Sequence, residues 1–138
     1  MSGFLLDTNV VSELRKAKRA DAGVRRWMDA NVTAELWLSV LVIGELRRGV
    51  ELIRRRDIAA ATSLDTWLDG LLDQYADRVL PVTTRVAERW ARITVPDAVS
   101  IIDGLLAATA IEHGLILVTR NVGDVASTGV ASLNPFTG

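Results

Sequence analysis

The sequence predicts an α/β domain with a mainly parallel central sheet that helices cover on both faces. Short apolar runs alternate along the chain with longer segments in which apolar residues recur about every 3.6 positions. The short runs are continuously apolar, which is typical of parallel strands buried on both faces. Strands that alternate with helices in this way build βαβ units. At 138 residues the chain has the length of one domain, and we expect residues 1–138 to form it.

The apolar runs predict five strands. The first stops at the polar tripeptide Asp7-Thr8-Asn9, and the fourth follows directly after Gly114. Each run is three to seven residues long, which is the usual length of a strand in a globular protein. The strands are expected at residues 4–6, 36–40, 79–82, 115–118 and 130–136.

The periodic segments between these runs predict six helices. Asp21 is the expected N-cap of the second helix, and Thr83 or Thr84 that of the fifth. The third and fourth helices follow each other closely and should pack as an antiparallel hairpin. The sixth is apolar nearly all the way round and should end at Gly114. The helices are expected at residues 9–16, 21–30, 41–56, 57–77, 84–93 and 98–111.

Composition excludes several classes of protein. The chain has no Cys, so it has neither a disulfide framework nor a thiolate metal site. No apolar run approaches the roughly 18 residues of a membrane span, and the first residues lack the charged start of a signal peptide. We therefore expect a cytoplasmic protein without membrane contact. The net charge of −1 argues against a protein that simply coats nucleic acid.

Arginine supplies 14 of the 16 basic residues, and several arginines cluster at 47–48, at 54–56 and at 85, 89 and 92. The planar guanidinium group is a bidentate partner for phosphate or carboxylate. The alternative is that each cluster is a solvated helix face with intrahelical ion pairs, such as Glu51 to Arg55.

Asp7 ends the first strand. In an open α/β sheet the carboxyl ends of the strands are where ligands bind, so Asp7 is a candidate functional residue. The alternative is that Asp7 or Thr8 only caps the following helix. The choice depends on whether other acidic residues reach the same place.

Asp103 is the sole charged residue between positions 98 and 111. An ionised carboxylate buried without a partner is very costly, so this group needs a cation, a cluster of donors or a water-filled cleft. Alternatively, Asp103 lies on a narrow exposed stripe of the helix or pairs with an arginine.

Glu45 and Asp124 are two further acidic candidates. Glu45 lies between Gly44 and the basic face of its helix. Asp124 lies in the polar loop 119–124, directly after a predicted strand, and should therefore emerge at the same edge as Asp7. Its alternative role is that of a turn or N-cap aspartate.

Four carboxylates in a chain with one His and no Cys suit a hard cation such as Mg²⁺ or Mn²⁺. Such a site would support metal-assisted hydrolysis of a phosphodiester.

Four spaced motifs and the chain's end resemble those of PIN-domain ribonuclease toxins, most closely of the VapC and FitB type. The motifs lie at residues 5–9, 44–49, 102–110 and 117–124, followed by 133–136. One departure is Val125, where an aromatic residue is more usual in the family. The resemblance implies a PIN-like α/β/α sandwich. It also implies a quartet of acidic residues around Mg²⁺ or Mn²⁺, namely Asp7, Glu45, Asp103 and Asp124, with polar support from Thr8, Asn9, Thr119 and Asn121.

The resemblance further implies an endoribonuclease that hydrolyses RNA phosphodiester bonds as the toxin of a type II toxin–antitoxin system. A protein antitoxin and a second copy of the chain, in a homodimer, are the implied partners. Two alternatives stay open. One is a phospho-receiver-like signalling domain, which is also a parallel α/β fold with Mg²⁺-binding acids, and the other is a non-catalytic PIN module that acts only by binding its partner.

Overall fold

A five-stranded, all-parallel sheet lies at the centre of the computed structural model, which describes residues 2–137. The strand order is β3-β2-β1-β4-β5, so β1 is the central strand. Phospho-receiver domains have the order 2-1-3-4-5, and the difference argues against that alternative. The strands are β1 (Phe4–Leu6), β2 (Leu36–Ser39), β3 (Val79–Leu80), β4 (Ile116–Val118) and β5 (Ser132–Leu133).

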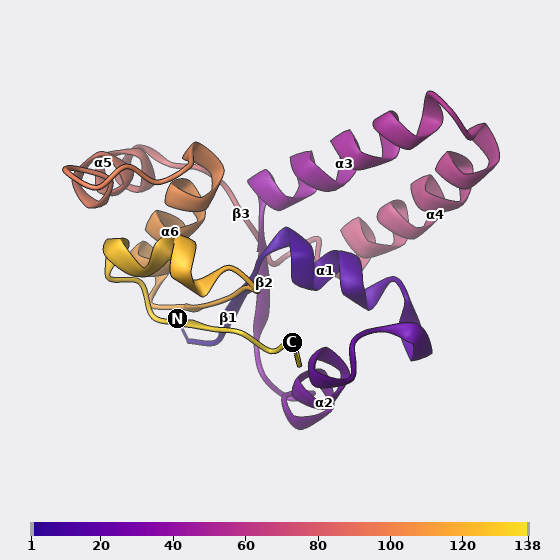
Figure 1. Ribbon diagram of the computed structural model, residues 1–138, viewed down its shortest axis with the longest axis horizontal. Helices are drawn as coiled ribbons and strands as arrows, with labels where there is room; N and C mark the ends of the chain where they lie inside the picture. Colours follow the sequence, from indigo (N-terminus) through magenta and orange to yellow (C-terminus); the bar gives the residue numbers. More distant parts are fainter. Residues whose placement is uncertain (1, 138) are drawn as a thin grey trace.

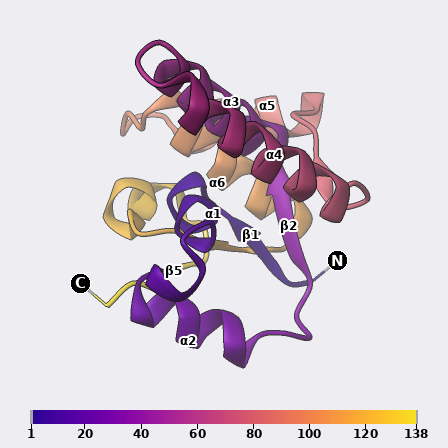
Figure 2. The same ribbon diagram turned by 90° about the vertical axis from the view of Figure 1, so that its right-hand side faces the viewer.

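Helices cover both faces of the sheet, as the sequence predicts. Figure 1 shows α5, α6 and the 3-10 helix η2 on one side, with α1, α2 and the long α3–α4 hairpin on the other. Figure 2 views the molecule from the side of the hairpin, so that α3 and α4 lie in front of α5 and α6. The helices are α1 (Thr8–Leu14), η1 (Ala17–Arg19), α2 (Ala22–Ala30), α3 (Val40–Arg54), α4 (Ile58–Gln74), α5 (Thr84–Ile93), α6 (Ile101–His113) and η2 (Val122–Thr128).

The core is built from the strands and the inner faces of the helices. Leu5 and Leu6 are consecutive in β1 and both are fully buried, because one points to each face of the sheet and both faces are covered. Leu38, Leu117 and Val118 of the neighbouring strands are buried in the same cluster. No helix within residues 2–137 combines the length and the apolarity needed to span a membrane.

The predicted helix ends are confirmed where a capping residue marks them. Asp21 accepts a hydrogen bond from the Val24 amide, and Thr83 accepts one from Val86. Gly114 ends α6 in the left-handed conformation, with a φ of 65°. The α3–α4 hairpin is also confirmed, and Figure 1 shows its two helices running side by side away from the sheet.

Three predicted segments differ from the structure, and the first two of these differences affect the site. Helix α6 begins at Ile101, three residues later than predicted, because Ser100 is its N-cap and has an extended backbone. Asp103 therefore lies in the first turn of α6. The predicted loop 119–124 is partly helical, because η2 begins at Val122 and includes Asp124. Strand β5 covers only two residues of the predicted run 130–136.

Candidate functional site

Asp7 is both a helix cap and a buried carboxylate at the end of the central strand. Its side chain is 6% exposed. Its Oδ1 atom accepts a hydrogen bond of 2.7 Å from the amide of Thr8, and its Oδ2 atom accepts one of 2.7 Å from the hydroxyl of Thr119. The capping role and the functional role are therefore compatible.

The ends of β1 and β4 are joined around Asp7 by the predicted supporting residues. Asn9 donates its side-chain amide to Asp7 Oδ2 at 3.4 Å, and its Oδ1 atom accepts from the backbone amide of Arg120 at 3.2 Å. The buried Thr119 hydroxyl accepts from the backbone amide of Asn121 at 3.0 Å. Asn121 thus contributes to this network through its backbone.

Glu45 reaches the same edge of the sheet from α3. Its side chain is exposed, and its Oε1 atom accepts a hydrogen bond of 2.5 Å from the hydroxyl of Thr8. Thr8 is the first residue of α1 and directly follows Asp7. The hydroxyl of Thr8 therefore fixes Glu45 next to the cap of α1.

Asp103 and Asp124 line a shared hollow of about 550 Å³ between α6 and η2. Asp103 is partly exposed and accepts a hydrogen bond of 2.8 Å from the hydroxyl of Ser100. Its place in the first turn of α6 puts the carboxylate near the positive end of the helix dipole. Asp103 lies within the apolar helix as expected, but it is only partly buried because the helix starts later than the apolar pattern indicates. Asp124 is exposed.

The electrostatics connect three of the four acids. Burial raises the pKa of Asp7, the hydrogen bonds from Thr119 and Thr8 act against that rise, and the negative charges of Asp103 and Glu45 add to it. Asp103 and Glu45 are thus near enough to act on Asp7, while Asp124 joins the group through the hollow that it shares with Asp103.

None of the four acids forms an ion pair with a basic side chain within residues 2–137. Over the same residues, no three His, Cys, Asp or Glu side chains lie close enough together to hold one metal ion between them. The donor set is nevertheless made of oxygen atoms and carries several negative charges, one of them on a buried carboxylate. This chemistry fits a hard divalent cation.

Ser100 is a site residue that the sequence reasoning missed. The pattern Ser100-Ile101-Ile102-Asp103 is a capping-box signature directly before an apolar run, and it marks both the start of α6 and the partner of Asp103. Here the hydroxyl of Ser100 is donated to the carboxylate of Asp103.

Most of the clustered arginines are engaged in ion pairs away from these acids. Arg47 and Arg54 both bind Asp65 across the α3–α4 hairpin, at 2.7 and 2.8 Å. Arg89 binds Glu112 at 2.8 Å and links α5 to α6. The predicted intrahelical partner of Glu51 is wrong, since Glu51 pairs with Arg54, one residue earlier than Arg55.

Comparison with known proteins finds a matching family and similar chains. Residues 4–123 match the PIN domain family. The VapC ribonuclease Y4jK of Sinorhizobium fredii is 34% identical, over 96% of this chain and 97% of that protein. The toxin FitB of Neisseria gonorrhoeae is 31% identical, over 96% and 98%. The crystal structure of FitAcB from Neisseria gonorrhoeae superposes with a TM-score of 0.85 at 33% identity, and the match covers 98% of both chains.

Proposed function

The chain belongs to the PIN domain family, in the group of VapC and FitB toxins, and on that premise we propose that it is a divalent-metal-dependent endoribonuclease. In this proposal it hydrolyses RNA phosphodiester bonds as the toxin of a type II toxin–antitoxin system. The ribonuclease name of the Sinorhizobium relative supports the reaction, and the toxin name of the Neisseria relative supports the role.

The observation that carries the proposal is the setting of Asp7. Its carboxylate is buried at the carboxyl end of the central strand, receives two short hydrogen bonds, and has other carboxylates as its charged neighbours. A structural carboxylate in such a position would normally be paired with a cation. A site that binds a cation as part of its function explains why acids gather here without arginine or lysine partners.

Asp7, Glu45, Asp103 and Asp124 are the residues that would hold Mg²⁺ or Mn²⁺. When bound, such an ion supplies Lewis acidity toward a phosphate oxygen and lowers the pKa of a water molecule. The chain's own polar groups hold the carboxylates in place for this purpose. Thr119 and the Thr8 amide fix Asp7, the Thr8 hydroxyl fixes Glu45, and Ser100 fixes Asp103.

The hydrolysis also needs a general base and residues that bind the RNA backbone. One of the carboxylates orients the attacking water and accepts its proton. Arginine side chains that are free of carboxylate partners hold the backbone of the RNA. No protein nucleophile is required.

The proposal extends to the organisation of the protein. Residues 1–138 act as one PIN domain, and β5 completes the sheet beyond the segment that matches the family. The partners are a cognate protein antitoxin and a second copy of this chain in a homodimer, and the protein acts in the cytoplasm. A non-catalytic, partner-binding PIN module is the alternative that the following experiment separates.

The test compares purified parent protein with Asp7→Asn and Asp103→Asn on total RNA, after removal of metal and after addition of Mn²⁺. Asp73→Asn is the matched control, because Asp73 is an exposed acid of α4 that forms no ion pair in the described chain. We expect Mn²⁺-dependent cleavage by the parent and the control, and none by the two site variants. Equal cleavage by all four proteins would refute the proposal. No cleavage by any of the four, with or without Mn²⁺, would favour the non-catalytic module.

A further inference from the structure

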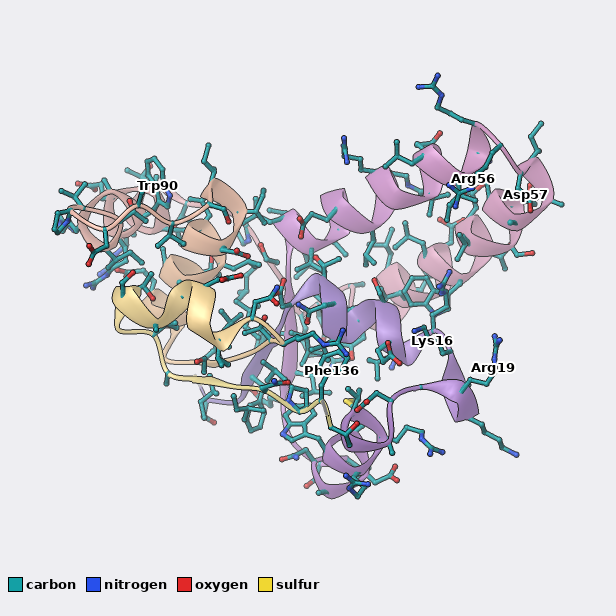
Figure 3. The ribbon with its side chains drawn as sticks, viewed as in Figure 1. Lys16, Arg19, Arg56, Asp57, Trp90 and Phe136 are labelled. Atoms are coloured by element: carbon teal, nitrogen blue, oxygen red, sulfur yellow. The ribbon has the colours of Figure 1, made fainter. Side chains whose placement is uncertain are left out.

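Five of the nine arginines and lysines that form no ion pair within residues 2–137 gather at one corner of the molecule, and the other four are Arg48, Arg55, Arg56 and Arg120. Arg15, Lys18, Arg19, Arg25 and Arg26 are exposed, and none of them forms an ion pair within residues 2–137. They follow the end of α1, line η1 and occupy the first turns of α2. We call these five residues the basic corner. In Figure 3 the labelled Lys16 and Arg19 mark its place, beyond the end of α1 and above α2.

The acids around the basic corner offer little neutralisation. Glu13 is already paired with Lys16 at 3.0 Å. Asp21 caps α2 and also binds the hydroxyl and amide of Thr137. Asp29 is the carboxylate that remains. A chain whose net charge is −1 therefore carries a local concentration of positive charge here.

Three residues of the basic corner line a hollow of about 540 Å³. Lys18, Arg25 and Arg26 line it together with one carboxylate, that of Asp29, and with the apolar side chains of Leu14 and Met28. Cationic walls over an apolar floor match the chemistry of a nucleotide, in which an anionic phosphate is attached to a flat base. Arginine is the side chain that best matches phosphate, because its planar group donates two parallel hydrogen bonds.

The corner is connected to the acidic site through α1. Asp7 caps the start of this helix, and a helix of seven residues is about 10 Å long. Arg15, at the far end, lines one groove with Thr8 and Glu45 at the near end. Arg15 therefore links the groove beside Glu45 to the rest of the basic corner along the chain.

We propose that the basic corner binds the sugar-phosphate backbone of single-stranded RNA beside the acidic site. This inference rests on the proposed function and adds a binding surface to it. RNA is favoured over an acidic protein segment because three of the cations line a nucleotide-sized hollow and because the groove beside Arg15 leads to Glu45.

The test is a binding measurement with a fluorescein-labelled, 16-nucleotide single-stranded RNA of mixed sequence. All proteins carry Asp103→Asn so that the RNA stays intact. Arg25→Ala/Arg26→Ala removes two cations from the corner. Arg55→Ala/Arg56→Ala is the matched control, because it removes an adjacent pair of exposed arginines from the end of the α3–α4 hairpin and changes the net charge equally. Melting temperatures establish that both variants are folded.

Loss of two phosphate contacts should lower the slope of log affinity against log salt by about 1.4, so that binding at 0.1 M salt is about 25-fold weaker. The control should bind within about twofold of its parent, since its arginines lie outside the route from the acids. Equal weakening in both double variants, or no RNA binding by the parent, would overturn the inference. So would a corner variant that binds RNA normally but no longer associates with its protein antitoxin.

These outcomes are separable from the fate of the proposed function. Cleavage is measured in proteins that keep Asp103. If the parent protein with Asp103 intact does not cleave RNA but the Arg25→Ala/Arg26→Ala variant still loses RNA binding, the nuclease proposal fails and the proposed RNA-binding surface is supported. If the parent protein cleaves RNA and the Arg25→Ala/Arg26→Ala variant binds RNA normally, the proposed RNA-binding surface is refuted and the nuclease proposal is unaffected.

Discussion

Replacement of Thr119 by Val tests whether the network around Asp7 is organised for an ionised carboxylate. Thr119 is 1% exposed, donates to Asp7 Oδ2 at 2.7 Å and accepts from the Asn121 amide at 3.0 Å. Valine has nearly the same shape but no hydroxyl. A hydrogen bond to a charged group contributes about 1.5–3 kcal/mol to the free energy of unfolding. For a chain of this length that loss lowers the melting temperature by about 6–12 °C.

The substitution should also change the pH dependence of stability and of activity in a defined direction. The hydrogen bond from Thr119 stabilises the ionised form of Asp7, so its removal raises the pKa of Asp7 beyond the increase that burial already causes. The stability difference between parent and variant should be full above the pKa of Asp7 in the folded protein and should decrease as the pH falls through it. If activity needs ionised Asp7, the acidic limb of the rate profile moves to higher pH in the variant.

Thr109→Val is the matched control for this experiment. Thr109 is also fully buried, but its hydroxyl donates to the Leu105 carbonyl within α6. The control should lose about 1 kcal/mol of stability and keep the acidic limb of the parent. Thermal unfolding and pH profiles of RNA cleavage measure both effects. A Thr119→Val protein whose acidic limb stays in place, or moves to lower pH, would refute the role given to this hydroxyl.

Three further predictions concern Ser100, the metal and Gly104. Ser100→Ala should reduce the Mn²⁺-dependent cleavage rate by about 10-fold or more, because it removes the hydroxyl that orients Asp103; an unchanged rate constant would contradict this. Mn²⁺ at 100 times its Kd should add about 2.7 kcal/mol to the stability of the parent and nothing to that of Asp103→Asn, so equal shifts in their melting temperatures would argue against a site there. Gly104→Ala should cost about 1–3 kcal/mol, because a Cβ would lie 2.9 Å from Trp90 Cδ1. Gly44→Ala meets nothing within 4 Å and should instead stabilise α3 by up to about 1 kcal/mol; calorimetry that reversed this order would be inconsistent with the packing.

Features encoded by neighbouring residues were predictable from the sequence. Asp21, Thr83 and Gly114 mark helix ends through their own side chains or backbone freedom, and each is confirmed in that role. The parallel sheet was also predictable, because consecutive buried residues such as Leu5 and Leu6 need cover on both faces.

Features that depend on contacts between distant segments were not predictable. The start of α6 at Ile101 is not such a feature, because the local pattern from Ser100 to Asp103 marks it and only the apolar run from residue 98 obscured it. The partners in ion pairs were not predictable, because Arg47 and Arg54 share Asp65, which lies on the next helix. The sequence motifs named the four acids, but only the fold relates Asp7 to Asp103 and Glu45.

Binding of Mn²⁺ measured alongside RNA cleavage tests the central claim most directly. Metal-free protein is titrated with Mn²⁺, and bound metal and the rate of RNA cleavage are followed in the same samples, for the parent and for Asp7→Asn. The account predicts that both signals rise over the same range of Mn²⁺ concentration in the parent and that both are lost in the variant. Cleavage by the parent at full rate in excess chelator, or unaltered Mn²⁺ binding by Asp7→Asn, would contradict it.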